Sequence, residues 1–137
     1  MNISKILKRI KPYNTLGMKL TGCDDESVSF GISLADNLND KNTMFAGSIY
    51  SALVLCAWTI AYKTINKDAV LYDVVIKNSS IEYLVPVRTD AVVKACIKDE
   101  PVLKSDWKAV VTIEARLFDD NGKLCAVFSG NYVCIRK

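Results

Sequence analysis

The chain has 137 residues, a length typical of one domain, and 50% of them are hydrophobic, which is enough for a core of its own. Its net charge of +3 is too small to indicate nucleic-acid binding, so we expect no nucleic-acid partner. Histidine is absent from the sequence. This absence excludes Ser-His-Asp and Cys-His catalysis, histidine-ligated zinc and any mechanism with an imidazole base. Any chemistry must therefore use carboxylates, hydroxyls, amides, lysines or backbone dipoles.

The five cysteines predict small apolar core residues rather than a disulfide or metal framework. Their number is odd and the closest pair is nine residues apart, so no Cys-x-x-Cys pattern exists. The N-terminus lacks the apolar run of a secretion signal, and free cysteines are typical of a reducing compartment, so we expect a cytoplasmic protein. The longest apolar stretch, residues 51–62, is too short to predict a membrane span.

The N-terminal residues predict a short amphipathic helix. Apolar residues recur at helical spacing from Ile3 to Ile10, with basic residues opposite. Pro12 is expected to end this helix, because a proline disfavours helical geometry in the residue before it. We expect an N-terminal helix within residues 1–11 that covers part of a single domain formed by residues 1–137.

The next segment predicts a β-hairpin followed by a polar loop. Residues 18–23 and 28–34 alternate apolar and polar side chains, as strands do, and the polar residues 24–27 between them form a turn. Residues 35–43 are rich in asparagine and predict a loop.

A long buried helix follows this loop. From Phe45 to Asn66 the chain carries almost no charge and is rich in alanine and leucine, which favour helix. Because this helix is apolar nearly all round, we expect it to be buried rather than amphipathic. A buried helix in so small a chain needs other elements wrapped around it.

Four strands are predicted in the remainder, where Val, Ile, Thr and Tyr are abundant: residues 70–87, 91–97, 109–118 and 123–135. A turn at residues 88–90 is expected between the first two, and Asp-Asp-Asn-Gly at 119–122 is typical of a hairpin turn between the last two. Pro101 is placed in the remaining connection. The pattern predicts an α+β fold in which a helix packs on one face of an antiparallel sheet.

Two sequence blocks at compatible spacing carry a family resemblance. The first reads Asn37-x-Asn39-x-x-x-Thr43-x-Phe45-x-Gly47-Ser48-x-Tyr50, followed by Ala52 and Trp58. The second runs from Ser80 to Val87 and has Asp90 just after it. Together they resemble a bacterial hotdog-fold family of proposed thioesterases, a domain also found C-terminal to some acetyltransferases. The resemblance covers residues 12–136 and implies a curled antiparallel sheet wrapped around one long central helix. It also implies a homodimer or a dimer of dimers, with the acyl-CoA site between subunits.

The junction between the loop and the long helix is the predicted catalytic site. The first N–H groups of a helix lack internal partners and carry the positive end of the helix dipole, so a thioester oxyanion would be stabilised there. The resemblance implies that Gly47 takes the place of a glycine in the His-Gly-Gly signature of acyl-CoA hotdog thioesterases, with Phe45 at the place of the histidine. We expect Gly47, Ser48 and Asn39 to be catalytic, because the Asn39 amide could hold a nucleophilic water without titrating. The alternatives are a helix start capped by Ser48 or Thr43 and a simple turn at Asn39.

The long helix lacks the carboxylate that the resemblance leads one to expect. Many acyl-CoA hotdog thioesterases carry an Asp or Glu nine residues after the signature histidine, and Val54 stands at that place here. Asp73 is the strand acid that could be reachable, whereas Glu82 and Ser80 are expected to share the opposite face. The residues predicted to bind substrate come from the two blocks: Asn37, Thr43, Phe45, Tyr50, Trp58 and Ser80.

Several functions stay open at this point. The main hypothesis is hydrolysis of an acyl thioester of CoA or of acyl carrier protein, without a cofactor or metal. The main alternative is a non-catalytic hotdog protein that binds acyl groups or acyl-CoA, which the missing histidine and helix carboxylate favour. A hydratase or dehydratase normally needs a histidine with an acid and is disfavoured. An interaction module that pairs with a separate acetyltransferase is the last hypothesis.

Overall fold

The computed structural model describes residues 2–137; Met1, which the predicted N-terminal segment includes, lies outside the described residues. The elements, in chain order, are α1 (Ile3–Leu7), α2 (Lys11–Thr15), β1 (Met18–Cys23), β2 (Ser27–Ile32), the 3-10 helix η1 (Ala35–Asn37), α3 (Ala46–Ile65), β3 (Tyr72–Tyr83), β4 (Ala91–Ser105), β5 (Lys108–Asp119) and β6 (Leu124–Arg136). The predicted first hairpin, long helix and last hairpin are confirmed.

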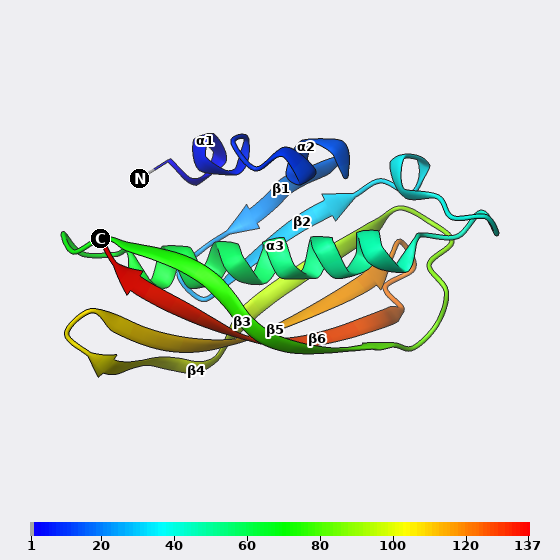
Figure 1. Ribbon diagram of the computed structural model, residues 1–137. Helices are drawn as coiled ribbons and strands as arrows, with labels where there is room; N and C mark the ends of the chain where they lie inside the picture. Colours follow the sequence, from blue (N-terminus) through cyan, green and yellow to red (C-terminus); the bar gives the residue numbers. More distant parts are fainter. Residues whose placement is uncertain (1) are drawn as a thin grey trace.

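A six-stranded antiparallel sheet curls around α3 (Figure 1). The strand order is β1-β2-β4-β5-β6-β3, so β3 lies at an edge beside β6 and not beside β4. The connection of residues 84–90 therefore crosses from this edge to the middle of the sheet. This arrangement is the hotdog fold that the sequence predicted.

Two prolines lie in other structural positions than those predicted. Pro12 starts α2 rather than ending a single helix, because the first turn of a helix needs no N–H from that residue. Pro101 lies inside β4, where the pairing register with β5 shifts between Asp99 and Val102. Such an irregularity tolerates a residue without an N–H. The β4–β5 hairpin is consequently longer than predicted.

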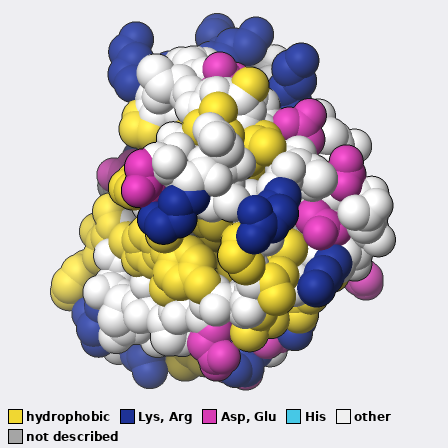
Figure 2. Space-filling model, turned by 90° about the vertical axis from the view of Figure 1, so that its right-hand side faces the viewer, with side chains coloured by type: hydrophobic (Ala, Val, Ile, Leu, Met, Phe, Trp, Pro, Cys, Tyr) yellow, Lys and Arg dark blue, Asp and Glu magenta, His cyan; other side chains and the backbone are white. Residues whose placement is uncertain are grey.

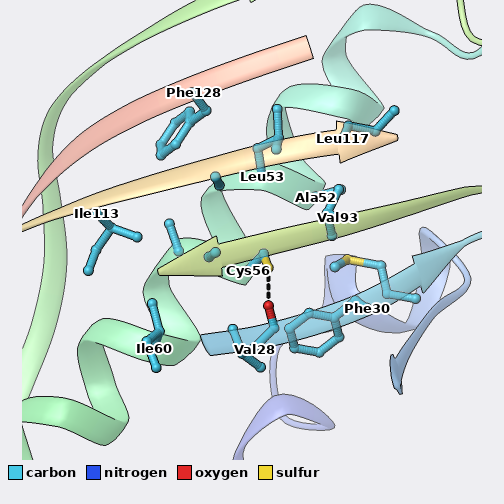
Figure 3. Close-up of a cluster of buried hydrophobic side chains, with 14 of the residues drawn as sticks. Val28, Phe30, Ala52, Leu53, Cys56, Ile60, Val93, Ile113, Leu117 and Phe128 are labelled. Carbon is cyan, nitrogen blue, oxygen red and sulfur yellow. Dashed lines mark hydrogen bonds between the residues drawn. The ribbon is translucent and has the colours of Figure 1, made fainter. Parts of the chain in front are cut away.

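One side of α3 is buried against the inner face of the sheet. Figure 3 shows Leu53, Cys56 and Ile60 pointing into this core, where the Cys56 thiol lies 3.6 Å from the Val28 carbonyl oxygen and donates to it. By length and composition α3 could cross a membrane, but this burial inside its own chain is typical of a core helix. The opposite side of α3 is only half-buried, so the expected burial all round is not reached within one chain.

The two faces of the sheet differ in what covers them. The inner face holds fully buried residues such as Val93 and Ile113, which pack against α3. The outer face, on the side away from α3, has no helix over it (Figure 1), and its residues on β3, β4 and β5 are exposed or half-buried. This alternation of buried and open positions is typical of an antiparallel sheet with one solvated face.

Candidate functional site

Three segments meet where α3 begins: the loop that follows β2, the first turn of α3, and the connection from β3 to β4. The N–H of Met44 donates to the Val87 carbonyl at 2.8 Å and thereby ties the loop to this connection. A cavity of about 320 Å³ lies between the segments, lined by Asn39, Thr43, Met44, Ala46, Ile49 and residues 83–87. Figure 2 shows this end of the molecule, where hydrophobic side chains gather beside Lys and Arg side chains.

The first turn of α3 has no side-chain cap. Phe45 occupies the N-cap position, and its carbonyl accepts the N–H groups of Ser48 at 3.0 Å and Ile49 at 3.1 Å. Within residues 2–137, no group accepts a hydrogen bond from the N–H of Ala46 or Gly47. The alternative of a start capped by Ser48 or Thr43 is therefore not realised. Two backbone donors at the positive end of a 20-residue helix stay free for a ligand oxygen.

The Phe45 side chain folds back over this first turn. Its ring lies so close to Gly47 that a Cβ at this position would collide with it. The ring is also accessible, since Phe45 is 55% exposed. The glycine thus makes room for the aromatic side chain that stands where the resemblance places a histidine.

Asn37 holds the loop before α3 in place through hydrogen bonds to backbone groups. It is 4% exposed, and its Nδ2 donates to the carbonyls of Leu16 and Ser33, both at 2.7 Å. The backbone carbonyl of Asn37 accepts the N–H of Phe45 at 2.8 Å. Because all these partners are backbone groups, Asn37 holds the start of α3 in place and is not directed at the cavity.

Asn39 closes a tight turn with Thr43. Its Oδ1 accepts the N–H groups of Lys41 at 2.8 Å and Thr43 at 3.0 Å, and its Nδ2 donates to the Thr43 hydroxyl at 2.8 Å. The turn predicted as the alternative is therefore present. One of the two Nδ2 hydrogens remains free, since an amide nitrogen carries two. Both side chains line the cavity, so this hydrogen is the Asn39 group available to a ligand.

A cluster of hydroxyls joins α3 to β3 beside the cavity. The Tyr83 hydroxyl donates to the Ala46 carbonyl at 2.9 Å, and the Tyr50 and Ser79 hydroxyl oxygens are 2.6 Å apart. Burial raises the pKa of Tyr83, and the nearby Tyr50 raises it further. Tyr83 and Ser79 were not predicted from the sequence as site residues, although Tyr83 belongs to the second block. Side chains alternate between the two faces of a strand, so Ser79 and Tyr83 lie on the face opposite to Ser80 and Glu82. This alternation is the signal that could have identified them.

The other predicted residues lie elsewhere. The Trp58 N–H donates to the Val74 carbonyl at 2.9 Å, about three helical turns beyond Gly47. Ser80 pairs with Ser129 in the register of β3 and β6, on the outer face and away from α3, as its alternation predicts. Asp73 pairs with Lys137 at 3.5 Å at the far end of β3. Of the predicted residues, Asn39 and Thr43 line the cavity, and Phe45 and Gly47 belong to the helix start next to Ala46, which also lines it. Tyr50 lines a separate cavity with Pro12 and Val54. Trp58, Ser80 and Asp73 lie away from the start of α3.

Residues 4–136 match the family described as "Putative thioesterase (yiiD_Cterm)". The chain belongs to this thioesterase family. The "putative thioesterase from Shewanella oneidensis" has a solved structure that is 31% identical, with a TM-score of 0.81 over 97% of this chain and 94% of that one. The "Putative esterase" of Saccharolobus solfataricus is 26% identical over 98% of this chain and 85% of its own length. A thioesterase of Haemophilus influenzae superposes with a TM-score of 0.79 over 99% of this chain and 92% of that one; at 12% identity this likeness shows the fold alone.

The residues that line the cavity decide which chemistry the site can perform. Among the described residues, those that line the cavity contribute amide, hydroxyl and backbone groups but no carboxylate. At Val54, where the resemblance leads one to expect an acid, the backbone carbonyl accepts the Tyr132 hydroxyl at 2.7 Å. The groups available for thioester chemistry here are thus hydrogen-bond donors rather than a titratable base.

Proposed function

We propose that this protein hydrolyses an acyl thioester of CoA or of acyl carrier protein in the cytoplasm, at the start of α3. The observation that carries the proposal is the pair of free N–H groups of Ala46, which lines the largely apolar cavity, and of Gly47, which follows it in the first turn of α3. Such donors, fixed before the reaction, stabilise the oxyanion that forms when a thioester carbonyl is attacked. The apolar cavity gives an acyl chain a place to lie. The five free cysteines fit a reducing compartment.

The attacking group in this proposal is a water molecule oriented by Asn39. The free Nδ2 hydrogen of Asn39 donates to the water oxygen, and the water attacks the thioester carbon. The tetrahedral intermediate then expels the thiolate with the electrons of the C–S bond, and the proton released by the water passes to this thiolate, so that a carboxylic acid and a thiol are formed. The Asn39–Thr43 turn keeps the amide in position throughout, because its backbone donors fix the direction of Oδ1.

A second copy of the chain would complete this site across β3. Within residues 2–137, β3 is a 12-residue edge strand that pairs with β6 alone, and an unpaired edge of this length is a template for another strand. Apolar side chains flank it, with Val75 54%, Ile76 37% and Tyr83 47% exposed. Pairing of two β3 edges would also cover the half-buried side of α3. We expect a homodimer in sedimentation experiments, and Ile76→Glu to convert it into single chains.

The activity is tested with a panel of acyl-CoA and acyl-carrier-protein thioesters, monitored for free thiol. Asn39→Ala is expected to lower kcat about tenfold or more, while Asn39→Asp, which keeps the two turn-forming acceptor bonds, separates the lost donor from a broken turn. Gly47→Ala is compared with Phe45→Ala/Gly47→Ala, because the second variant removes the ring that the new Cβ would strike. Unchanged hydrolysis in all these variants would place the chemistry elsewhere.

Non-catalytic binding of acyl thioesters is the alternative that one observation favours. α3 contains no acidic residue, and the place of the expected carboxylate is taken by Val54. The same panel decides between the two functions. Saturable binding of a thioester without release of thiol would establish the binding protein and exclude the esterase.

A further inference from the structure

The positive charge of the chain is concentrated near its N-terminus. Of the 18 Lys and Arg, five lie within residues 1–23, which contain no Asp or Glu, and all 15 acidic residues follow this segment. The rest of the chain therefore has more acidic than basic residues, although the net charge of the whole chain is +3. Such an asymmetry indicates that the basic segment meets an anionic partner.

Four of these cations follow one another along α1 and α2, and all four are exposed: Lys5, Lys8, Arg9 and Lys11. We call them the basic face. The apolar residues of the same segment point into the molecule, since Leu7 is fully buried and Ile3 and Ile10 pack against the core. At about 100° per residue, Lys5 and Lys8 lie on the side of α1 opposite these apolar residues. Figure 2 shows Lys and Arg side chains along the upper edge of the molecule, where α1 and α2 lie in Figure 1.

The basic face is not neutralised by acidic side chains of its own chain. Among residues 2–137, the three ion pairs involve none of its four cations. Its backbone is nevertheless fixed: the Asn2 Oδ1 accepts the N–H of Lys5 at 3.2 Å, and the Asn14 Nδ2 donates to the Lys8 carbonyl at 3.0 Å. The second bond ties α2 to the end of α1. Charge complementarity for an anionic partner is thus present before any contact is made.

We propose that the basic face binds the surface of a lipid bilayer that contains anionic lipids. Clusters of about four to eight Lys or Arg on an amphipathic helix are typical of segments that bind such surfaces, and the inner surface of a cell membrane is anionic. The contact is electrostatic and superficial, because the apolar side chains of α1 pack into the core and are not available for insertion. It needs no complementary shape, since each long cationic side chain can meet a lipid headgroup in a fluid layer.

The residue types of the segment favour a lipid surface over an acidic protein or a nucleic acid. Three of the four cations are lysines, and lysine is depleted at protein interfaces, where arginine and aromatic residues are enriched. Single-stranded nucleic acids stack their bases on aromatic side chains. Tyr13, the one aromatic residue within residues 1–23, is half-buried and packs edge-on against Phe30, with ring centroids 5.9 Å apart. The basic face therefore offers charge without an aromatic anchor.

The membrane contact leaves the candidate site at the start of α3 open. Ile10 and Pro12 line a cavity with residues of α3 that lie within 50–55, about one to two helical turns beyond Ala46. The N-terminal helices thus flank the middle of α3 and not its first turn. Membrane binding neither needs thioester hydrolysis nor blocks it, so this proposal does not depend on the proposed function.

Co-sedimentation of the full chain with vesicles tests the proposal. The wild type is expected to bind vesicles of equal parts phosphatidylcholine and phosphatidylglycerol, not vesicles of phosphatidylcholine alone, and to be released by high salt. Each cation near an anionic surface strengthens binding about fivefold (about 1 kcal/mol), so Lys8→Gln/Arg9→Gln/Lys11→Gln should weaken binding about a hundredfold. Glutamine has nearly the helix propensity of lysine, so α1 and α2 should persist.

A matched control removes the same charge from three other exposed positions. Lys98→Gln/Lys104→Gln/Lys123→Gln changes β4 and the turn between β5 and β6, and it should bind the anionic vesicles within about twofold of the wild type. Because all six substituted side chains are exposed, both variants should unfold at the wild-type urea concentration.

Each outcome decides the proposal. Binding to anionic vesicles that is lost in the first triple variant and kept in the control supports it. Equal losses in both variants overturn it, because net charge and not the basic face would then govern binding. Equal binding to both kinds of vesicle, or none to either, also overturns it. Retention of the wild type on immobilised polyglutamate, without binding to vesicles, would overturn it in favour of an acidic protein partner.

Discussion

The two sides of α3 differ in their burial and in the type of their side chains. The side against the sheet is aliphatic and sealed, with Leu53 and Ile60 fully buried. The other side is aromatic and half-buried, and its polar tips reach β3: Tyr50 meets Ser79 and the Trp58 N–H meets the Val74 carbonyl. Aromatic side chains with a polar end suit a surface that is apolar at one end and wet at the other. One side of α3 thus holds the fold together, and we propose that the other side receives a substrate or a second chain.

The largest expected effect is loss of stability on the sealed side. Leu53→Ala removes a fully buried side chain from the contact with the sheet and leaves a cavity, so we expect the free energy of unfolding to fall by about 3 kcal/mol. Val54→Ala, one residue on but half-buried, should cost less than about 1 kcal/mol in the single chain. Urea unfolding of both variants measures the difference. Equal losses would show that the two sides do not differ in this way.

The next largest effect is expected on the rate of thioester hydrolysis, from a change on the half-buried side of α3. Tyr50→Phe removes one partner of the 2.6 Å hydroxyl pair near the start of α3 while keeping the ring against Phe128. We expect kcat/KM for thioester hydrolysis to fall about tenfold, with the unfolding free energy changed by less than about 1 kcal/mol. Ser79→Ala should give the same loss, and the double variant no more than either single one. Additive losses would mean that the hydroxyls act separately.

The sequence predicted what is local and left out what depends on distant strands. The last hairpin could be predicted because its turn is self-contained: Gly122 has φ of 80°, and the Asp119 carboxylate accepts the N–H groups of Asn121 and Lys123. The family blocks likewise led to the start of α3. The position of β3 beside β6 could not be derived from its own residues, because strand pairing is non-local. For the same reason Ser79 was not connected with Tyr50, which lies 29 residues earlier in the chain.

The last expected effect tests how well the core excludes water at high pH. Burial raises the pKa of Cys134 to about 11 and also raises the pKa of Cys56 on the sealed side of α3. A thiol in the unfolded chain ionises near pH 8.5. Below about pH 8.5 the folded and the unfolded chain both keep these thiols protonated, so the unfolding free energy does not depend on their ionisation. Above that pH the unfolded chain loses its protons first, and the unfolding free energy should fall by about 1.4 kcal/mol per pH unit for each buried thiol, until the folded pKa of Cys134 is passed near pH 11. Cys134→Ala should flatten this slope by one thiol, whereas Cys23→Ala, at an exposed cysteine, should leave it unchanged. A stability that stays constant above about pH 8.5 would show that water reaches these thiols in the folded chain, and the contrast between the sealed and the open side of α3 would then be one of shape rather than of solvation.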